Sequence, residues 1–299
     1  MGLRRQLPKS IFVAGGGPVG VEFATIFAGL GVPTTISDSA DRLIHTMDGE
    51  MSKLIAEHLK RIGVDVILGS TTREIRRVDL SLEVTLTNGR SLHPDAVLFA
   101  AGRSVNTDGL GLEAAGVEMD KLGRIRVDRD YKTTADGIYA AGDVLGPSLA
   151  SVAVEQGRIA ACRIFGIELK GFVDPMRPSA VYSMPEVAGV GLTEEQCRSQ
   201  GLDYVVGRSD LSLIPRGAIA GHGGILKLIF DKKDRRLLGV HCFGDIASEV
   251  VGVGQMVIHF NATIDTFLEV TLNTPTYTYA YKYAAIDGIR KLDNFKQKH

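Results

Sequence analysis

The sequence predicts an α/β domain followed by a second domain of α+β type, and three features carry this prediction. Short apolar runs alternate with amphipathic segments between residues 8 and 98, as strands and helices do in a parallel sheet. A glycine-rich turn, residues 15–20, separates the first apolar run from the first amphipathic segment. From about residue 178, most strand-like runs precede two long helical segments, which is typical of an α+β domain.

Glycine and proline mark where the helices of the first region end. The first helical segment stops at Gly31, with Pro33 two residues later, and the second stops at Gly63. Asn88-Gly89 lies between two short apolar runs and predicts an antiparallel hairpin inserted in the parallel sheet. The expected strands are residues 11–14, 34–37, 64–68, 84–86, 91–92 and 96–99, and the expected helices are 19–30 and 50–62.

The remaining chain is expected to contain a loop-rich segment and then the second domain. Residues 104–134 are rich in loop-forming residues, a short strand is expected at 138–141, and a helix at 149–165. A domain boundary is expected between residues 166 and 178. Beyond it the expected strands are 180–182, 187–190, 204–206, 225–230 and 237–243, and the expected helices are 194–200, 247–260 and 277–292.

Composition excludes several classes of function. The net charge of −1 and the lack of a long Lys/Arg run argue against a nucleic-acid partner. No apolar stretch approaches the roughly 20 residues of a membrane span. Cys162, Cys197 and Cys242 are far apart and form no CxxC pair, so neither a disulfide framework nor a metal site is expected. We therefore expect a cytoplasmic protein without a bound metal.

The glycine turn has the spacing of a dinucleotide site in a Rossmann-like domain. Gly15 permits the tight turn, Gly17 allows close approach of a pyrophosphate, and Gly20 lets the helix lie against the strand. The helix that begins at Pro18-Val19 would offer its free N–H groups to the phosphates. Asp38, at the end of the second strand, would accept hydrogen bonds from the adenosine ribose and repel a 2′-phosphate. The sequence therefore predicts an NAD(H) site, although the nearby Arg42 leaves NADP(H) open. The residues of the predicted turn are Gly15, Gly16, Gly17, Pro18, Val19 and Gly20.

A second nucleotide signature lies far downstream. Residues 134–143, Thr-Ala-Asp-Gly-Ile-Tyr-Ala-Ala-Gly-Asp, and residues 100–107 resemble two motifs of the two-dinucleotide-binding flavoproteins, the class I pyridine nucleotide-disulfide oxidoreductases. The resemblance implies that Asp143 binds the FAD ribitol, that Gly142 beside it belongs to the cofactor-binding segment, and that the helix starting near Ala150 faces the flavin. It also places Gly102 in a cofactor-binding segment. Glu22 matches a family position at the nicotinamide end of NAD.

The C-terminal region resembles the interface domain of the same family. Residues 182–187, 189–194, 238–244 and 273–281 carry this likeness, which is greatest to the soluble pyridine nucleotide transhydrogenases. The resemblance implies a homodimer, and we expect the alternating tyrosines at 277, 279, 281 and 283 to pack at its interface. It divides the chain into an NAD(P)-binding domain (1–103), the C-terminal part of an FAD-binding domain (104–166) and a dimerisation domain (167–299).

The chain departs from that family at two places. Thr274 and Tyr279 occupy the positions where disulfide reductases carry their proton-accepting His and its Glu partner, and the paired redox cysteines are absent. We therefore assign no catalytic residue, and thiol reduction is disfavoured. The segment that holds the ADP half of FAD in the family is also missing. A truncated protein that binds FAD weakly or not at all is expected.

Three functions remain in view from the sequence. The first is a soluble transhydrogenase-like oxidoreductase that passes hydride between NADPH and NAD through FAD. The second is a non-catalytic NAD(H)-binding dimerisation module, with a possible separate flavin-binding partner. The third is a dihydrolipoamide dehydrogenase-like protein without redox cysteines or catalytic His. A single-domain nicotinamide dehydrogenase is disfavoured, because the chain contains no Tyr-x-x-x-Lys motif.

Overall fold

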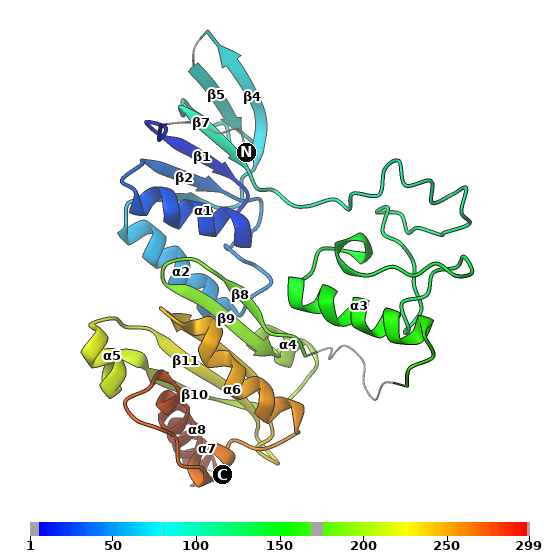
Figure 1. The fold of residues 1–299 in the computed structure, drawn as a ribbon. Coiled ribbons are helices and arrows are strands. Elements are labelled where there is room, and N and C mark those ends of the chain that lie inside the picture. The colour runs from blue at the N-terminus through cyan, green and yellow to red at the C-terminus, as the bar shows by residue number, and fades with distance from the viewer. Residues whose placement is uncertain (1–5, 80, 169–175, 298–299) are drawn as a thin grey trace. The chain divides into compact units, whose positions relative to one another are not determined.

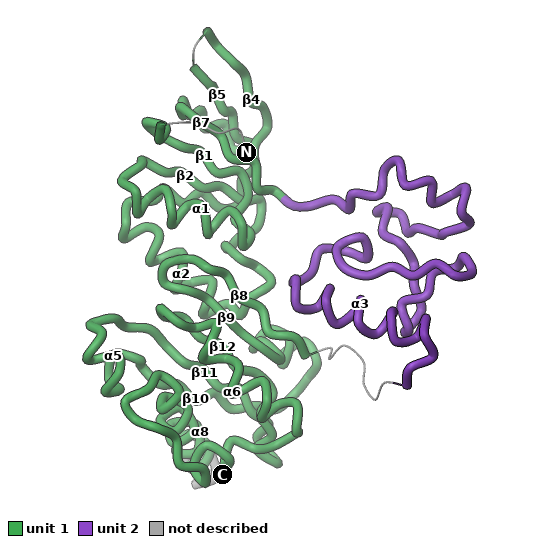
Figure 2. Tube along the Cα trace, viewed as in Figure 1, with its two compact units in different colours: residues 1–101, 176–299 green, residues 102–175 purple. Residues whose placement is uncertain are grey.

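The structure is a computed structural model that describes residues 6–79, 81–168 and 176–297 (Figure 1). It divides into two compact units (Figure 2): unit 1 comprises residues 1–101 and 176–299, and unit 2 comprises residues 102–175. The domain boundary expected between residues 166 and 178 runs through residues 169–175, which lie outside the described residues.

Unit 1 begins with a parallel four-stranded sheet in the order β3-β2-β1-β7. All four residues of β1 are buried, because this strand lies between two neighbours and has a covering layer on each face. The elements are β1 (Ile11–Ala14), α1 (Pro18–Gly29), β2 (Thr34–Ser37), α2 (Gly49–Arg61), β3 (Asp65–Ile67) and β7 (Ala96–Phe99). The expected α/β order is confirmed.

A small antiparallel sheet interrupts the parallel one, as the Asn88-Gly89 turn predicted. It consists of β4 (Thr72–Val78), β5 (Ser81–Leu86) and β6 (Ser91–Leu92). Val84 and Leu86 are fully buried and share a core cluster with Phe12 and Ala14 of β1. The hairpin sheet thus provides apolar cover for β1 on the side where its Phe12 points.

The second part of unit 1 is an antiparallel five-stranded sheet in the order β10-β11-β12-β9-β8. Residues of α6 and α8 share one large core cluster with its strands. The strands are β8 (Ser179–Val181), β9 (Glu186–Gly191), β10 (Tyr204–Asp210), β11 (Ile225–Asp231) and β12 (Leu237–Gly244). The helices are α4 (Glu194–Ser199), α5 (Pro215–Ala220), α6 (Ala247–His259), α7 (Thr266–Glu269) and α8 (Ala280–Gln297). The expected strands and helices of this domain are confirmed, and β10 runs four residues further than expected.

Two of the alternating tyrosines serve the protomer's own core, so the expectation that they pack at a subunit interface is wrong for these two. Tyr281 is fully buried, stacks on Phe267 at 4.6 Å between ring centroids, and donates its hydroxyl to the Val250 carbonyl at 2.8 Å. Burial raises the pKa of Tyr281 far above its usual value of 10. Tyr277 is also buried. Their side chains are needed inside the fold, where periodicity alone cannot place them.

Helix α2 belongs to both parts of unit 1. Its residues Ile55 and Leu59 are fully buried in a core cluster that also contains Val187 of β9 and Phe243 of β12. The α2 helix therefore closes the parallel sheet on one side and covers the antiparallel sheet on the other. The two predicted domains share a hydrophobic core across this helix.

A buried charge cluster lies at the N-terminus of α2. Lys227 of β11 is 1% exposed, and its ammonium reaches Asp48 at 2.7 Å, Glu194 at 2.6 Å and Glu50 at 3.1 Å. Asp48 is fully buried and caps α2 by accepting the Glu50 N–H at 3.1 Å. Arg208 of β10 completes the set by donating to both carboxylate oxygens of Glu50. We call these five residues the Lys227 cluster.

The protonation of this cluster follows from its charges. Burial by itself raises the pKa of Asp48, but the charge of Lys227 and hydrogen bonds from Lys227 and from the Glu194 N–H bring it below the usual 3.8. Burial by itself lowers the pKa of Lys227, but Asp48, Glu194 and Glu50 together raise it above the usual 10.5. Lys227 and Asp48 are therefore both charged at neutral pH, which is the state in which their attraction offsets their desolvation.

Unit 2 contains α3 (Ala150–Ile164) and a short 3₁₀ helix, η1 (Gly142–Leu145). The expected helix at 149–165 is confirmed. The expected strand at 138–141 is wrong: among the described residues this segment makes one isolated bridge, between Tyr139 and Lys132. A strand needs a neighbour along its length to pair its backbone groups, and here it has one only at a single residue. None of the described helices is long and apolar enough to cross a membrane.

Replacing Lys227 by methionine is expected to lower the free energy of unfolding by about 3–5 kcal/mol at pH 7, because three carboxylates lose their shared cation. Because the pKa of Asp48 is lowered in the folded wild type, its contribution to stability is present above the usual pKa of 3.8 and is lost only below that pH, so it persists at pH 4.5. Without Lys227 the pKa values of the buried carboxylates rise, so these groups are partly protonated at pH 4.5 and their burial is less unfavourable. The difference in unfolding free energy between variant and wild type should therefore be smaller at pH 4.5 than at pH 7. Urea denaturation at both pH values measures it. Lys291→Met, which removes a half-exposed pair with Asp287, is the control and should cost less than about 1 kcal/mol.

Candidate functional site

The glycine turn lies at the C-terminal end of β1 and depends on two of its glycines. Gly15 has φ +115°, and its N–H donates to the Ser37 carbonyl of β2 at 2.8 Å. A Cβ at Gly15 would collide with the backbone of Ala100, and one at Gly20 would collide with the Gly15 carbonyl oxygen. These positions admit only glycine because backbone lies where a side chain would begin.

The N-terminus of α1 is open. Pro18 is its first residue, and Gly17 precedes it as the N-cap without any side-chain hydrogen bond to the helix. The first regular helical bond runs from the Val21 N–H to the Gly17 carbonyl at 3.0 Å. The preceding N–H groups lack an intrahelical partner and carry the positive end of the helix dipole. This is the arrangement that receives a phosphate group.

Asp38 is brought directly to the glycine turn. Its carboxylate accepts the Gly16 N–H at 2.5 Å and the Ala40 N–H at 2.7 Å. The parallel pairing of β1 with β2 places the ends of both strands at the same edge of the sheet. The fold therefore joins an acid and a phosphate-binding turn that are 22 residues apart in the sequence.

Arg42 is the residue that kept NADP(H) as an alternative ligand in the sequence analysis. In the structure its guanidinium is bound by other groups of the protein. Its guanidinium donates to Glu195 at 3.1 Å, to the His45 carbonyl at 3.0 Å and to the Met47 carbonyl at 3.4 Å. Glu195 lies on α4, 153 residues away in the chain. The sequence carries no signal for this pairing, since it depends on the packing of two sheets.

Glu22 of α1 makes a contact that sequence analysis did not anticipate. Its carboxylate accepts the backbone N–H of Tyr182 at 2.9 Å, at the end of β8. Val19, one turn earlier on the helix, is partly exposed. Glu22 thus ties the phosphate-binding helix to the antiparallel sheet.

The predicted flavin residues lie in unit 2. The Gly142 N–H donates to the Gln156 side chain of α3 at 2.8 Å, and Asp143 accepts the Ser148 N–H at 3.1 Å. The Asp143 side chain is 58% exposed, with Arg103 at 4.0 Å. Ala150 is the first residue of α3, whose N-cap makes no side-chain hydrogen bond. Gly102 has φ +134° and open space where a Cβ would be.

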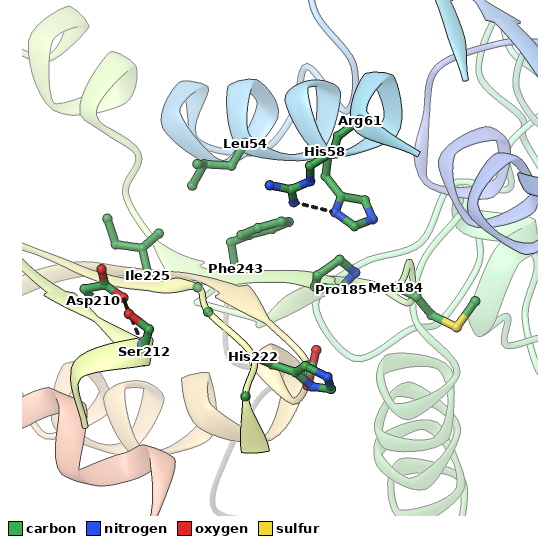
Figure 3. A pocket seen from close by; sticks show the side chains of 14 residues that line it. Leu54, His58, Arg61, Met184, Pro185, Asp210, Ser212, His222, Ile225 and Phe243 are labelled. Atoms are coloured by element: carbon green, nitrogen blue, oxygen red, sulfur yellow. Dashed lines mark hydrogen bonds and ion pairs between the residues drawn. The ribbon is translucent and has the colours of Figure 1, made fainter. Parts of the chain in front are cut away.

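A separate cavity of about 730 Å³ lies between α2 and the antiparallel sheet, and Figure 3 shows its lining. Its polar side chains pair with one another: Arg61 donates to His58 at 2.9 Å, and His222 contacts Asp245. Burial lowers the pKa of His58, and the Arg61 charge adds to this effect. Two histidines scattered in the sequence thus meet in one cavity, which contains none of the predicted cofactor residues.

Comparison with known proteins identifies the family. Residues 2–157 match pyridine nucleotide-disulphide oxidoreductases, and residues 177–285 match the dimerisation domain of the same family. The chain belongs to this family. It is 37% identical over 290 residues to a soluble pyridine nucleotide transhydrogenase of Vibrio parahaemolyticus, and 38% identical to the one of a Marinomonas species.

Solved structures agree with this assignment. The fold superposes with a TM-score of 0.89 on the HOCl-induced flavoprotein disulfide reductase RclA from Escherichia coli, at 30% identity and covering 95% of this chain and 65% of that one. For LpdA from Mycobacterium tuberculosis the TM-score is 0.87 at 28% identity, with 95% and 62% covered. The transhydrogenase matches cover 95% of this chain and 62% of each relative's length.

The collision at Gly20 predicts a specific defect. Gly20→Ala is expected to move α1 away from β1 and to weaken NADH binding by about tenfold or more, since one ångström of misplacement is costly in a phosphate site. Fluorescence titration with NADH measures the affinity. Gly29→Ala is the matched control on the same helix, because its Cβ would lie at an ordinary 3.8 Å from Met184. Equal affinities of the two variants would contradict the proposed role of Gly20.

Proposed function

We propose that this chain supplies pyridine-nucleotide binding and dimerisation in a soluble transhydrogenase-like flavoprotein oxidoreductase. In the complete reaction hydride passes from NADPH through FAD to NAD⁺, giving NADP⁺ and NADH. The observation that carries the proposal is the open N-terminus of α1 beside Asp38. The likeness to transhydrogenases over 95% of the chain supports it.

The residues of the turn would act on a pyridine dinucleotide in distinct ways. Free N–H groups at Gly17 and the first turn of α1 would bind the pyrophosphate. Asp38 would accept the ribose hydroxyls, and its negative charge disfavours a 2′-phosphate. Because Arg42 is paired with Glu195, it is not available to offset that charge. We therefore propose NAD(H) as the preferred ligand of this turn.

The chemistry of unit 2 fits part of an FAD site. Asp143 presents a half-exposed carboxylate that can accept ribitol hydroxyls, and the start of α3 at Ala150 directs the positive end of its dipole outward. When bound, FAD would supply the relay that takes up a hydride from one nicotinamide and gives it to another. We retain the division into domains at 1–103, 104–166 and 167–299 as part of this proposal.

Hydride relay suits this chain better than thiol chemistry does. Burial raises the pKa of Cys197 and of Cys242 above 9.0, so neither is a ready nucleophile. Thr274 and Tyr279 offer no general base of the usual kind. The three cysteines are free thiols, which is also the usage of a cytoplasmic protein, and we propose that location.

A second candidate is a non-catalytic NAD(H)-binding dimerisation module that works with a separate flavin-binding partner. Exposed apolar side chains on unit 2 favour a covering partner: Val154 is 67% exposed, Phe165 77% and Leu122 68%. Such side chains gain free energy when another surface removes them from water.

One titration series tests the proposal. NADH is expected to bind saturably at one site per chain and more tightly than NADPH, because of the Asp38 charge. With added FAD, reduction of thio-NAD⁺ by NADPH is followed by absorbance. Saturable NADH binding without any transhydrogenation would favour the module, whereas binding of neither nucleotide would sink both candidates.

We also propose that the dimerisation domain forms a homodimer, as the matched family domain implies. Met256 lies on α6, and Phe260 lies one turn later, directly after the last residue of that helix. Their side chains are 54% and 70% exposed, so they offer an apolar surface to a second copy. Light scattering of the wild type at micromolar concentration should give twice the monomer mass. Met256→Asp should shift the mass toward the monomer, whereas Lys233→Asp at the β11–β12 turn should not. A monomeric wild type would contradict the proposal.

A further inference from the structure

The segment that links Asp38 to α2 contacts the glycine turn of the predicted nucleotide site. This β2–α2 loop, residues 39–47, contains no regular helix or strand. The Ile44 N–H donates to the Gly16 carbonyl at 2.8 Å. The fully buried Leu43 packs so closely that a Cβ on Gly16 would lie 2.6 Å from its Cδ2 atom. The position of Gly16 in the turn thus depends on the shape of this loop.

That shape includes a strained residue. Ile44 has φ 41°, in the left-handed region, although it is β-branched and 1% exposed. Such a conformation costs on the order of 1–3 kcal/mol and persists only where surrounding contacts impose it. The bond to Gly16 is one such contact. The Ile44 carbonyl also accepts the Met47 N–H at 2.8 Å and the Ser52 hydroxyl at 3.5 Å, and residues of the dimerisation domain hold the segments on either side of Ile44.

The dimerisation domain holds both the middle and the end of the loop. Arg42 is clamped between Glu195 of α4, at 3.1 Å, and two carbonyls of the loop itself, those of His45 and Met47. Asp48, the residue after the loop, accepts the Glu194 N–H at 3.2 Å and pairs with Lys227. Glu195 is the charged partner that holds Arg42 in place. Arg42 in turn holds the two carbonyls of His45 and Met47, which follow Ile44.

We propose that Glu195 is a positioning residue for the pyridine-nucleotide site. Through Arg42 it keeps the β2–α2 loop in the strained conformation that aligns Gly16 and Asp38, without touching the nucleotide. This inference rests on the proposed function of the glycine turn as a nucleotide site. It gives the dimerisation domain a share in nucleotide affinity, because removing Glu195 lets the loop relax away from Gly16.

A double-mutant cycle tests the coupling. Glu195→Ala and Arg42→Ala are each expected to weaken NADH binding about fivefold, and the double variant is expected to be no weaker than the worse single variant. Arg198→Ala is the matched control: Arg198 also pairs with Glu195, at 3.6 Å, but does not contact the loop, and its loss should leave NADH affinity unchanged. Arg42→Lys, which keeps the positive charge, should recover part of the affinity.

A measurement without nucleotide separates this inference from the proposed function. Amide hydrogen exchange of residues 39–47 should be faster in Glu195→Ala and Arg42→Ala than in wild type and Arg198→Ala, with α6 amides unchanged in all four. Additive losses of affinity, or equal exchange in the loop, would overturn the positioning role. If the wild type does not bind NADH, the proposed function fails, and loop exchange still decides whether Glu195 fixes the loop.

Discussion

The attachment of α2 to the antiparallel sheet depends on one buried cation. Lys227 extends from β11 and meets three carboxylates: Asp48 and Glu50 come from the start of α2, and Glu194 comes from α4. Desolvating these groups is unfavourable, and it is tolerated because each charge has partners within hydrogen-bonding distance. Asp48 also caps α2, so the same carboxylate starts the helix and attaches it to β11 of the antiparallel sheet through Lys227.

A buried histidine, His241, lies next to this cluster, and neighbouring glycines leave space for its ring. His241 of β12 is 2% exposed and its Nε2 atom bonds to the Leu192 carbonyl at 2.9 Å. Burial is the main cause of its lowered pKa, so the ring is neutral at pH 7. A Cβ on Gly189 would lie 2.5 Å from the His241 Nδ1 atom, and one on Gly239 would collide with the Leu192 backbone. Gly189 therefore leaves room for the imidazole, and Gly239 leaves room for the Leu192 carbonyl to which the imidazole is hydrogen-bonded.

Because α2 packs on both sheets, the glycine turn is connected through the core of unit 1 to the matched dimerisation domain. The glycine turn touches the β2–α2 loop at Ile44, the loop touches α4 at Arg42, and α1 touches the end of β8 through Glu22. All three contacts are hydrogen bonds or ion pairs. The contacts of Arg42 and of Glu22 join residues that are more than a hundred positions apart in the sequence. In this chain, hydrogen bonds and ion pairs thus connect the glycine turn and α1 to the matched dimerisation domain.

The sequence by itself determined most of the element order, the parallel sheet, the hairpin at Asn88-Gly89 and the proximity of the glycine turn to Asp38, but not α5, α7 or the loop at 138–141. The features that it determined follow from local periodicity, turn chemistry and the rule that parallel strands end at one edge. Only the tertiary structure decided that Arg42 faces Glu195, that Lys227 is buried among carboxylates, and that Tyr277 and Tyr281 serve the core. Only the tertiary structure showed that residues 138–141 lack a neighbouring strand along their length within the described part of the chain. Ion pairing, strand pairing and burial depend on which distant segments of the chain come into contact. The local sequence pattern does not contain that information.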